Sequence, residues 1–217
     1  MNKPEEISVV LENPFTMFIA GPTKSGKTTF VDNLLANASQ YYSDEPNLVF
    51  YFYNMHKPTH PRLLKNVDQF IEGVPSKEWL KDVHFHYGKN LTIVIDDQAM
   101  SLSDELAELF TVGSSRAQAN IIFITQNLFM PAKQARTISL NCNYFVIFKN
   151  PRDVQAAQNF LKQLEGNTKT LCDIYADATS EPHSYLFIDL HQKTRSENRF
   201  LSNIFSENEK PPVLYRC

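Results

Sequence analysis

Cysteine is scarce in this chain of 217 residues, in which Cys142, Cys172 and Cys217 are the three that occur. Their number is odd, they lie far apart, and no C-x-x-C pair is present. A disulfide framework or a structural zinc site needs closely patterned cysteines, so we expect neither. The pattern instead indicates free thiols in a reducing compartment.

Long apolar runs are also lacking. No stretch of 18 apolar residues occurs, and residues 1–6 carry two acids without an apolar run. A membrane-spanning helix and a secretory signal both need such runs, so the sequence predicts neither. We therefore expect an intracellular protein that does not act at a membrane.

The chain has no excess of positive charge, because 21 lysines and arginines stand against 24 acids and give a formal net charge of -3. This balance argues against an open basic surface that coats nucleic acid, but a few concentrated cations would hardly alter it. Net charge thus leaves a nucleic acid partner undecided. The length suits one α/β domain, which buries about 70% of its unfolded surface.

The most informative stretch is "GPTKSGKTT" at residues 21–29, which matches the P-loop pattern G-x-x-x-x-G-K-[ST]. Backbone N–H groups of such a loop surround phosphates, Lys27 reaches the β and γ oxygens, and Thr28 binds Mg²⁺. An apolar strand at 15–20 precedes the loop and an amphipathic helix at 28–35 follows it, so the phosphates would meet a helix N-terminus. The residues predicted to bind ATP are Gly21, Pro22, Thr23, Lys24, Ser25, Gly26, Lys27, Thr28 and Thr29.

A second motif is the apolar strand at 91–95, which runs directly into Asp96 and Asp97. Such a strand is typical of a Walker B motif, whose first acid reaches the Mg²⁺ of the P-loop, and we assign Asp96 to the metal. Asp97 points to the opposite side of the strand, where a carboxylate orients and deprotonates water. Together with the P-loop, the motif predicts ATP hydrolysis.

Another predicted strand, at 119–127, ends in polar residues. In P-loop ATPases with an additional strand between the P-loop and Walker B strands, that strand presents a polar residue to the γ-phosphate and the attacking water. Gln126 fits this sensor position, and Asn127 is the alternative. The alternative to a sensor role is a structural one, in which the side-chain amide only forms a hydrogen bond with a backbone group at the end of the strand.

The remaining segments follow apolar periodicity. We predict further strands at 47–53, 83–87, 144–149 and 185–190, and helices at 63–71, 101–113, 152–165 and 171–178. The predicted organisation is an N-terminal extension at 1–13, a P-loop ATPase domain at 14–190 and a polar C-terminal arm or tail at 191–217.

Four segments, "GPTKSGKTT", "LTIVIDD", "SSRAQANIIFITQNLF" and "ARTISLNCNYFVIFKNPRD", together resemble the genome-packaging ATPases of the FtsK–HerA superfamily, found in large-capsid DNA viruses and virus-like polinton elements. The likeness runs from about Phe15 to Asp189. It implies a RecA-like α/β core with a mostly parallel central sheet and helices on both faces. It further implies a homo-oligomeric ring, a pentamer or hexamer, that couples ATP hydrolysis to pulling double-stranded DNA through its pore.

The resemblance also implies roles and partners. By position, Lys27 and Thr28 match the phosphate and Mg²⁺ groups, Asp96 the Walker B acid, and Gln126 the polar sensor. Many relatives carry a glutamate at the position of Asp97, which reaches one methylene further. A capsid or a portal or vertex protein would be the partner, in the infected cell or at a virion vertex.

An arginine finger is expected from a neighbouring subunit, because a cation stabilises charge that builds on the γ-phosphoryl group. Arg116, just before the strand at 119–127, is the first choice, and Arg136 and Arg152 are the alternatives. Cationic character alone makes Lys24, Lys133 and the loop from His56 to Arg62 candidates for DNA contacts.

Two other functions stay open on the sequence. A small thymidine kinase has a P-loop and an acid pair, but it usually carries a zinc-binding lasso with paired cysteines, which this chain lacks. An ATP-gated assembly or scaffold protein would bind nucleotide with negligible turnover, and the short acid Asp97 supports that alternative.

Overall fold

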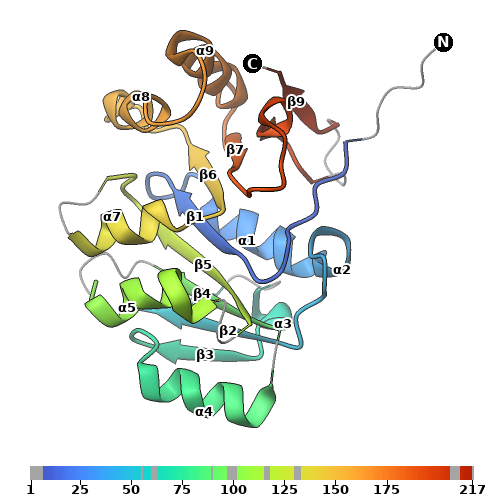
Figure 1. Cartoon of the computed structure of the whole chain (residues 1–217), viewed down its shortest axis with the longest axis vertical. Coiled ribbons are helices and arrows are strands. Elements are labelled where there is room, and N and C mark those ends of the chain that lie inside the picture. The colour runs from blue at the N-terminus through green and yellow to red at the C-terminus, as the bar shows by residue number, and fades with distance from the viewer. Residues whose placement is uncertain are drawn as a thin grey trace.

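The computed structural model describes residues 7–54, 56–59, 63–88, 90–96, 102–114, 118–129, 133–205 and 211–216. These residues form a mixed α/β fold in which one nine-stranded sheet is flanked by helices (Figure 1). The strands are β1 (Thr16–Ala20), β2 (Leu48–Tyr53), β3 (Gln69–Glu72), β4 (Leu91–Asp96), β5 (Ala119–Thr125), β6 (Tyr144–Phe148), β7 (Tyr185–Asp189), β8 (Phe200–Ser202) and β9 (Val213–Tyr215). The helices are α1 (Lys27–Ala36), α2 (Ala38–Tyr41), α3 (Leu63–Asn66), α4 (Lys77–Tyr87), α5 (Asp104–Glu108), the π-helix η1 (Leu109–Gly113), α7 (Lys133–Leu140), α8 (Val154–Leu161), α9 (Thr168–Ala178) and the 3-10 helix η2 (Ser196–Asn198).

The strand order is β3-β2-β4-β5-β1-β6-β7-β8-β9. The first six strands run parallel, and β7, β8 and β9 continue the sheet antiparallel. β5 lies between β1, which precedes the P-loop, and β4, the predicted Walker B strand, which is the position expected for the additional strand. The predicted mostly parallel sheet is confirmed.

Two hydrophobic cores cover the two faces of the sheet. Alternation along β2 shows the division, because Tyr51 belongs to the core with α1, whereas Phe50 and Phe52 belong to the core with α5, α7, α8 and α9. The helices accordingly lie on both sides of the sheet (Figure 1). β1, β5 and β6 are buried at every residue, as expected for parallel strands covered on both faces.

Of the elements predicted beyond the second strand, one helix is confirmed only in its first part and one strand is wrong. The predicted helix at 63–71 ends at Asn66 and is followed by the edge strand β3, and the predicted strand at 83–87 is the last part of α4. The Trp79 backbone N–H donates to Ser76 Oγ at 3.1 Å near the start of α4. The Trp79 ring then packs edge-on against Phe50 and Phe52, at centroid distances of 5.0 and 4.8 Å. Packing of this helix on the sheet therefore outweighs the short alternating pattern at residues 83–87, which favours a strand.

The C-terminal segment was predicted as a polar arm, and this is wrong for the residues of β8 and β9, which extend the sheet. Phe200 pairs with Ile188 of β7 and with Tyr215 of β9, and it is buried. At the other end, Leu11 lies within the predicted N-terminal extension but is fully buried and bridges to Tyr42.

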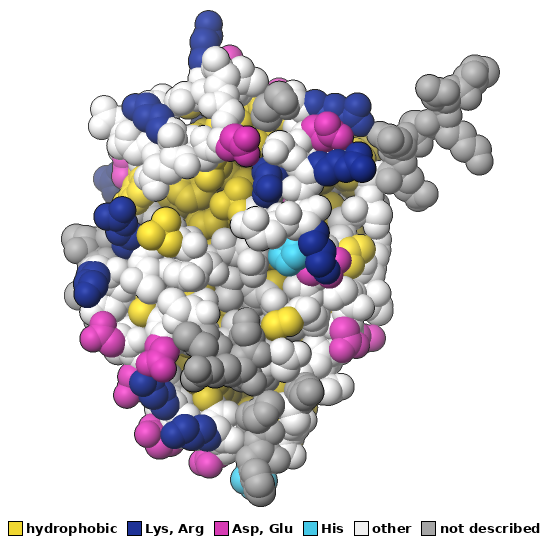
Figure 2. Space-filling view, viewed as in Figure 1, with side chains coloured by type: hydrophobic (Ala, Val, Ile, Leu, Met, Phe, Trp, Pro, Cys, Tyr) yellow, Lys and Arg dark blue, Asp and Glu magenta, His cyan; other side chains and the backbone are white. Residues whose placement is uncertain are grey.

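The surface shown in Figure 2 carries both signs of charge. Lysine and arginine side chains are interspersed with aspartate and glutamate on this face, in keeping with the near-balanced composition. Within the described residues, no helix is long and apolar enough to cross a membrane. Cys142 and Cys172 are free thiols, and Cys142 is buried.

Candidate functional site

The P-loop connects the end of β1 to the start of α1, as the sequence predicts. Gly26 stands immediately before α1 with φ +110°, a backbone conformation that favours glycine. Gly21 has a different constraint, since an added Cβ would lie 2.6 Å from Phe148 Cβ and 2.8 Å from Ser25 Oγ. Both glycines are thus required by the shape of the loop and by its contact with β6.

Lys27 folds back over the loop. Its Nζ donates to Gly21 O at 2.7 Å and to Pro22 O at 2.9 Å, and the side chain is part-buried. The ammonium group is therefore held over the loop that the motif predicts to surround phosphates. Thr28 follows in the first turn of α1, where backbone N–H groups lack partners within the helix.

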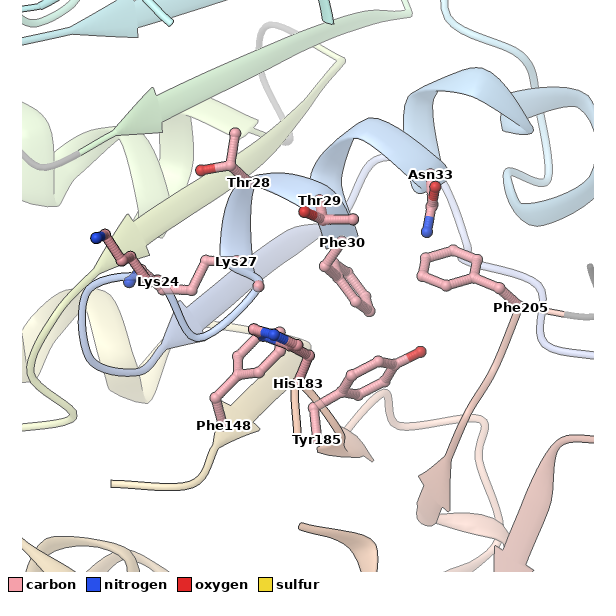
Figure 3. A pocket seen from close by; sticks show the side chains of 11 residues that line it. Lys24, Lys27, Thr28, Thr29, Phe30, Asn33, Phe148, His183, Tyr185 and Phe205 are labelled. Atoms are coloured by element: carbon pink, nitrogen blue, oxygen red, sulfur yellow. The ribbon is translucent and has the colours of Figure 1, made fainter. Parts of the chain in front are cut away.

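A cavity of about 430 Å³ opens beside the P-loop. Figure 3 shows that residues of the loop and of α1 form one side and that aromatic side chains from later parts of the chain form the other. His183 Nδ1 lies 3.3 Å from Ser25 O, which joins the β7 side to the loop. The lining residues are Lys24, Gly26, Lys27, Thr28, Thr29, Phe30, Asn33, Phe148, His183, Tyr185 and Phe205.

The aromatic wall of this cavity is held by ring contacts. Phe30 of α1 packs edge-on against Tyr185 at a centroid distance of 4.9 Å and lies tilted against Phe205 at 5.0 Å. The Phe148 ring lies 5.5 Å from Tyr185. Phe148, His183, Tyr185 and Phe205 are not among the site residues predicted from the sequence. No motif marks them, because they lie on or near β6, β7 and β8, which reach the P-loop strand only through the pairing of β6 with β1, β7 with β6 and β8 with β7.

Asp96 ends β4 and is half-buried. Its Oδ2 accepts a hydrogen bond of 2.6 Å from the hydroxyl of Tyr51 on the neighbouring strand β2. Burial raises the pKa of Tyr51, and the negative charge of Asp96 raises it further, so this phenol is a proton donor at neutral pH. Tyr51 is likewise absent from the predicted site, because its position beside β4 depends on the pairing of β2 with β4.

The strand register brings the ends of β4, β5 and β1 into line. Asp96 is opposite Ile124, and Thr125 is opposite Ala20, the last residue before the P-loop. Gly21 N donates to Thr125 O at 3.3 Å, which ties the start of the loop to the end of β5. The P-loop and the acidic motif that begins at Asp96 therefore meet at one edge of the sheet, where the parallel strands end.

The polar tip of β5 lies at this same edge. Gln126 and Asn127 line a small second cavity together with Ala20 and Gly21. The Asn127 backbone N–H donates to Thr125 Oγ1 at 3.3 Å, so the chain turns directly after the strand. Both sensor candidates thus stay next to the P-loop.

The other predicted site residues are placed as follows. Asp97 and Arg116 lie outside the described residues. Arg136 on α7 and Arg152 before α8 are described, and both are exposed. The roles of all four residues therefore remain predictions.

The candidate DNA contacts are only partly described. Lys24 and Lys133 are exposed, and residues 60–62 of the predicted contact loop lie outside the described residues. Lys57 in this loop stacks its Nζ over the Phe70 ring, 4.5 Å from the centroid, so its cation has an intramolecular contact.

A mostly parallel sheet in which β5 lies between β1 and β4, with helices on both faces and a P-loop sequence after β1, defines a RecA-like P-loop NTPase fold. Among solved structures, the chain is similar to the genome packaging NTPase B204 from Sulfolobus turreted icosahedral virus 2. The complex with AMP is 12% identical, with 84% of this chain and 96% of that chain covered and a TM-score of 0.52. The complex with ATP-gammaS is 11% identical, with coverages of 83% and 95% and a TM-score of 0.53. No protein-family model and no curated protein sequence matches the chain.

Proposed function

We propose that this chain is a genome-packaging ATPase of the FtsK–HerA superfamily, which hydrolyses ATP and moves double-stranded DNA into a capsid. The observation that carries the proposal is the meeting of the P-loop, Asp96 and the polar tip of β5 at one edge of the sheet. The likeness in fold to a viral genome packaging NTPase, over nearly the whole of that protein, supports it.

The residues present fit a Mg²⁺–ATP ligand. There is no room for a Cβ at Gly21, and Gly26 has a left-handed backbone, so the loop keeps the glycines that let a phosphate approach its backbone. Lys27 supplies a cation over the loop. The hydroxyl of Thr28 and the carboxylate of Asp96 are hard oxygen donors of the kind that Mg²⁺ prefers. When bound, Mg²⁺ neutralises charge on the β- and γ-phosphates.

The cavity beside the loop would hold the nucleoside part of ATP. Its volume of about 430 Å³ falls in the range of ordinary ligand pockets. The rings of Phe148, His183 and Tyr185 offer faces and edges against which a base can stack. Lys27, over the loop at one end of this cavity, would then contact the phosphates.

Hydrolysis needs a base, a polar sensor and a cation that acts on the transition state. We assign these roles to Asp97, to Gln126 and to Arg116 of a neighbouring copy in a homo-oligomeric ring. Gln126 already lies beside Gly21 through their shared cavity. The same ring would surround the DNA, with a capsid or vertex protein as its further partner.

The experiment that tests this function measures ATP turnover of the purified protein with and without double-stranded DNA over a salt series. We expect DNA to stimulate turnover and the stimulation to fade between about 50 and 200 mM salt, because contacts with phosphates release counterions. Turnover that ignores DNA at all salt concentrations would contradict the motor and favour a scaffold. Transfer of phosphate to deoxynucleosides would instead favour a small kinase.

A further inference from the structure

The hydroxyl of Tyr51 contacts the predicted metal-binding acid, although β2 itself carries no nucleotide-binding motif. Tyr51 pairs with Val94 in the parallel register of β2 and β4, and Asp96 lies two residues beyond Val94. Because side chains alternate along a strand, Val94 and Asp96 point to the same face of the sheet. Tyr51 belongs to the core on that face, so its hydroxyl reaches toward Asp96.

The ring of Tyr51 is held rigidly. The side chain is fully buried, and the Phe70 ring of the edge strand β3 lies 5.5 Å from it. A buried ring in a packed core has few alternative rotamers, so the position of its hydroxyl is set by the sheet. The hydroxyl therefore offers Asp96 a fixed hydrogen-bond donor.

The hydrogen bond itself is short. At 2.6 Å from Tyr51 Oη to Asp96 Oδ2, it falls in the range of O–H···O⁻ bonds to an ionised acceptor, which are roughly twice as strong as neutral ones. It fixes Oδ2 on the side of β2 and so sets the plane of the carboxylate. A metal-binding carboxylate oriented in this way is ready before the cation arrives, and partners of this kind affect metal affinity by about 10–100-fold.

We propose that Tyr51 is a positioning residue that orients the Asp96 carboxylate for the divalent cation of the nucleotide site. The proposal rests on the proposed function, since it assumes that Asp96 binds the cation of a Mg²⁺–nucleotide complex. It adds β2 to the elements that build the site, through a residue that does not itself touch the nucleotide.

The test replaces Tyr51 by phenylalanine, which keeps the ring and removes the hydroxyl. Mn²⁺ serves as the probe, and its binding to the protein with a non-hydrolysable ATP analogue is measured by electron paramagnetic resonance. We expect Tyr51→Phe to weaken Mn²⁺ binding about 10-fold or more. Affinity for the analogue in EDTA should stay at the wild-type value, because the P-loop contacts are unchanged.

Tyr144→Phe is the matched control. Tyr144 is also a buried tyrosine of the α1-side core, and its hydroxyl accepts a hydrogen bond of 3.0 Å from the Glu12 backbone N–H. It begins β6, at the opposite end of the parallel strands from the P-loop. Losing this hydroxyl also removes one hydrogen bond, but we expect Mn²⁺ binding to keep its wild-type constant.

The outcomes separate the inference from the proposed function. Wild-type Mn²⁺ binding by Tyr51→Phe would overturn the positioning role, and so would an equal loss of analogue affinity in EDTA and in Mn²⁺, which indicates general damage. If Tyr51→Phe weakens Mn²⁺ binding but leaves the affinity for the analogue in EDTA unchanged, the positioning role is supported. If the wild-type protein binds no Mn²⁺ with the analogue, the proposed function fails before the role of Tyr51 is at issue.

Discussion

Replacing Lys27 by alanine should abolish ATP turnover, with a fall of about 10²–10³-fold or more, the size seen when one preorganised donor to a developing charge is removed. Lys27 is the cation that the structure holds over the P-loop, through its two hydrogen bonds to Gly21 O and Pro22 O. Without it, negative charge on the β- and γ-phosphates is offset less both in the bound state and in the transition state. Steady-state kinetics on the purified variant measure the change.

Lys162→Ala is the control for this change, because Lys162 is an exposed lysine just after α8 and contributes nothing to the proposed nucleotide site. It should retain wild-type turnover. Lys27→Ala protein that hydrolyses ATP as fast as wild type would show that the measured activity does not come from the P-loop. In that case the assignment of the whole site would be wrong.

Replacing Asp97 by asparagine should separate binding from hydrolysis. The amide keeps the size of the side chain but cannot accept a proton, so we expect turnover to fall by about 10²–10⁴-fold, the usual contribution of a general base. ATP affinity should stay close to that of wild type, because the phosphate contacts come from the P-loop. Equilibrium binding and turnover measured on the same preparation test both parts.

Two further variants serve as controls for Asp97→Asn. Asp97→Glu retains a carboxylate and should retain hydrolysis, whereas Asp173→Asn on the exposed surface of α9 should change neither binding nor turnover. Hydrolysis by Asp97→Asn at the wild-type rate would refute the base assignment. A wild-type protein that binds ATP but turns it over negligibly would favour the scaffold alternative.

The parts of the site that were predictable from the sequence are those in which neighbours along the chain create the chemistry. The P-loop lies between a strand and a helix, and Asp96 ends a strand, where the sequence placed them. The order of β1, β5 and β4 also followed, because the polar tip after β5 marked it as the additional strand. Each of these features depends on a short run of residues that are adjacent in the sequence.

The parts that were missed depend on contacts between distant residues. Tyr51 and Asp96 are 45 positions apart and meet only through the register of β2 and β4. Phe148 and His183 lie against Gly26 because β6 and β7 extend the sheet beside the P-loop strand. The sequence pattern predicts that an aromatic residue in an apolar strand is part of the core, and it does not show whether the side chain also lines a cavity.

The errors in secondary structure have a related cause. The five residues at 83–87 alternate like a strand, but they complete α4, whose Trp79 packs on Phe50 and Phe52. β8 and β9 contain three residues each, too few for a periodic pattern, and they form because β7 offers an antiparallel edge. In both places tertiary packing decides the local structure.

The central claim is that ATP hydrolysis moves double-stranded DNA, and displacement of a third-strand oligonucleotide from a linear duplex tests it most directly. We expect the wild-type protein to release the third strand with ATP, but not with a non-hydrolysable analogue, and we expect Lys27→Ala to release none. A wild-type protein that hydrolyses ATP in the presence of this DNA, yet leaves the third strand in place, would contradict the claim.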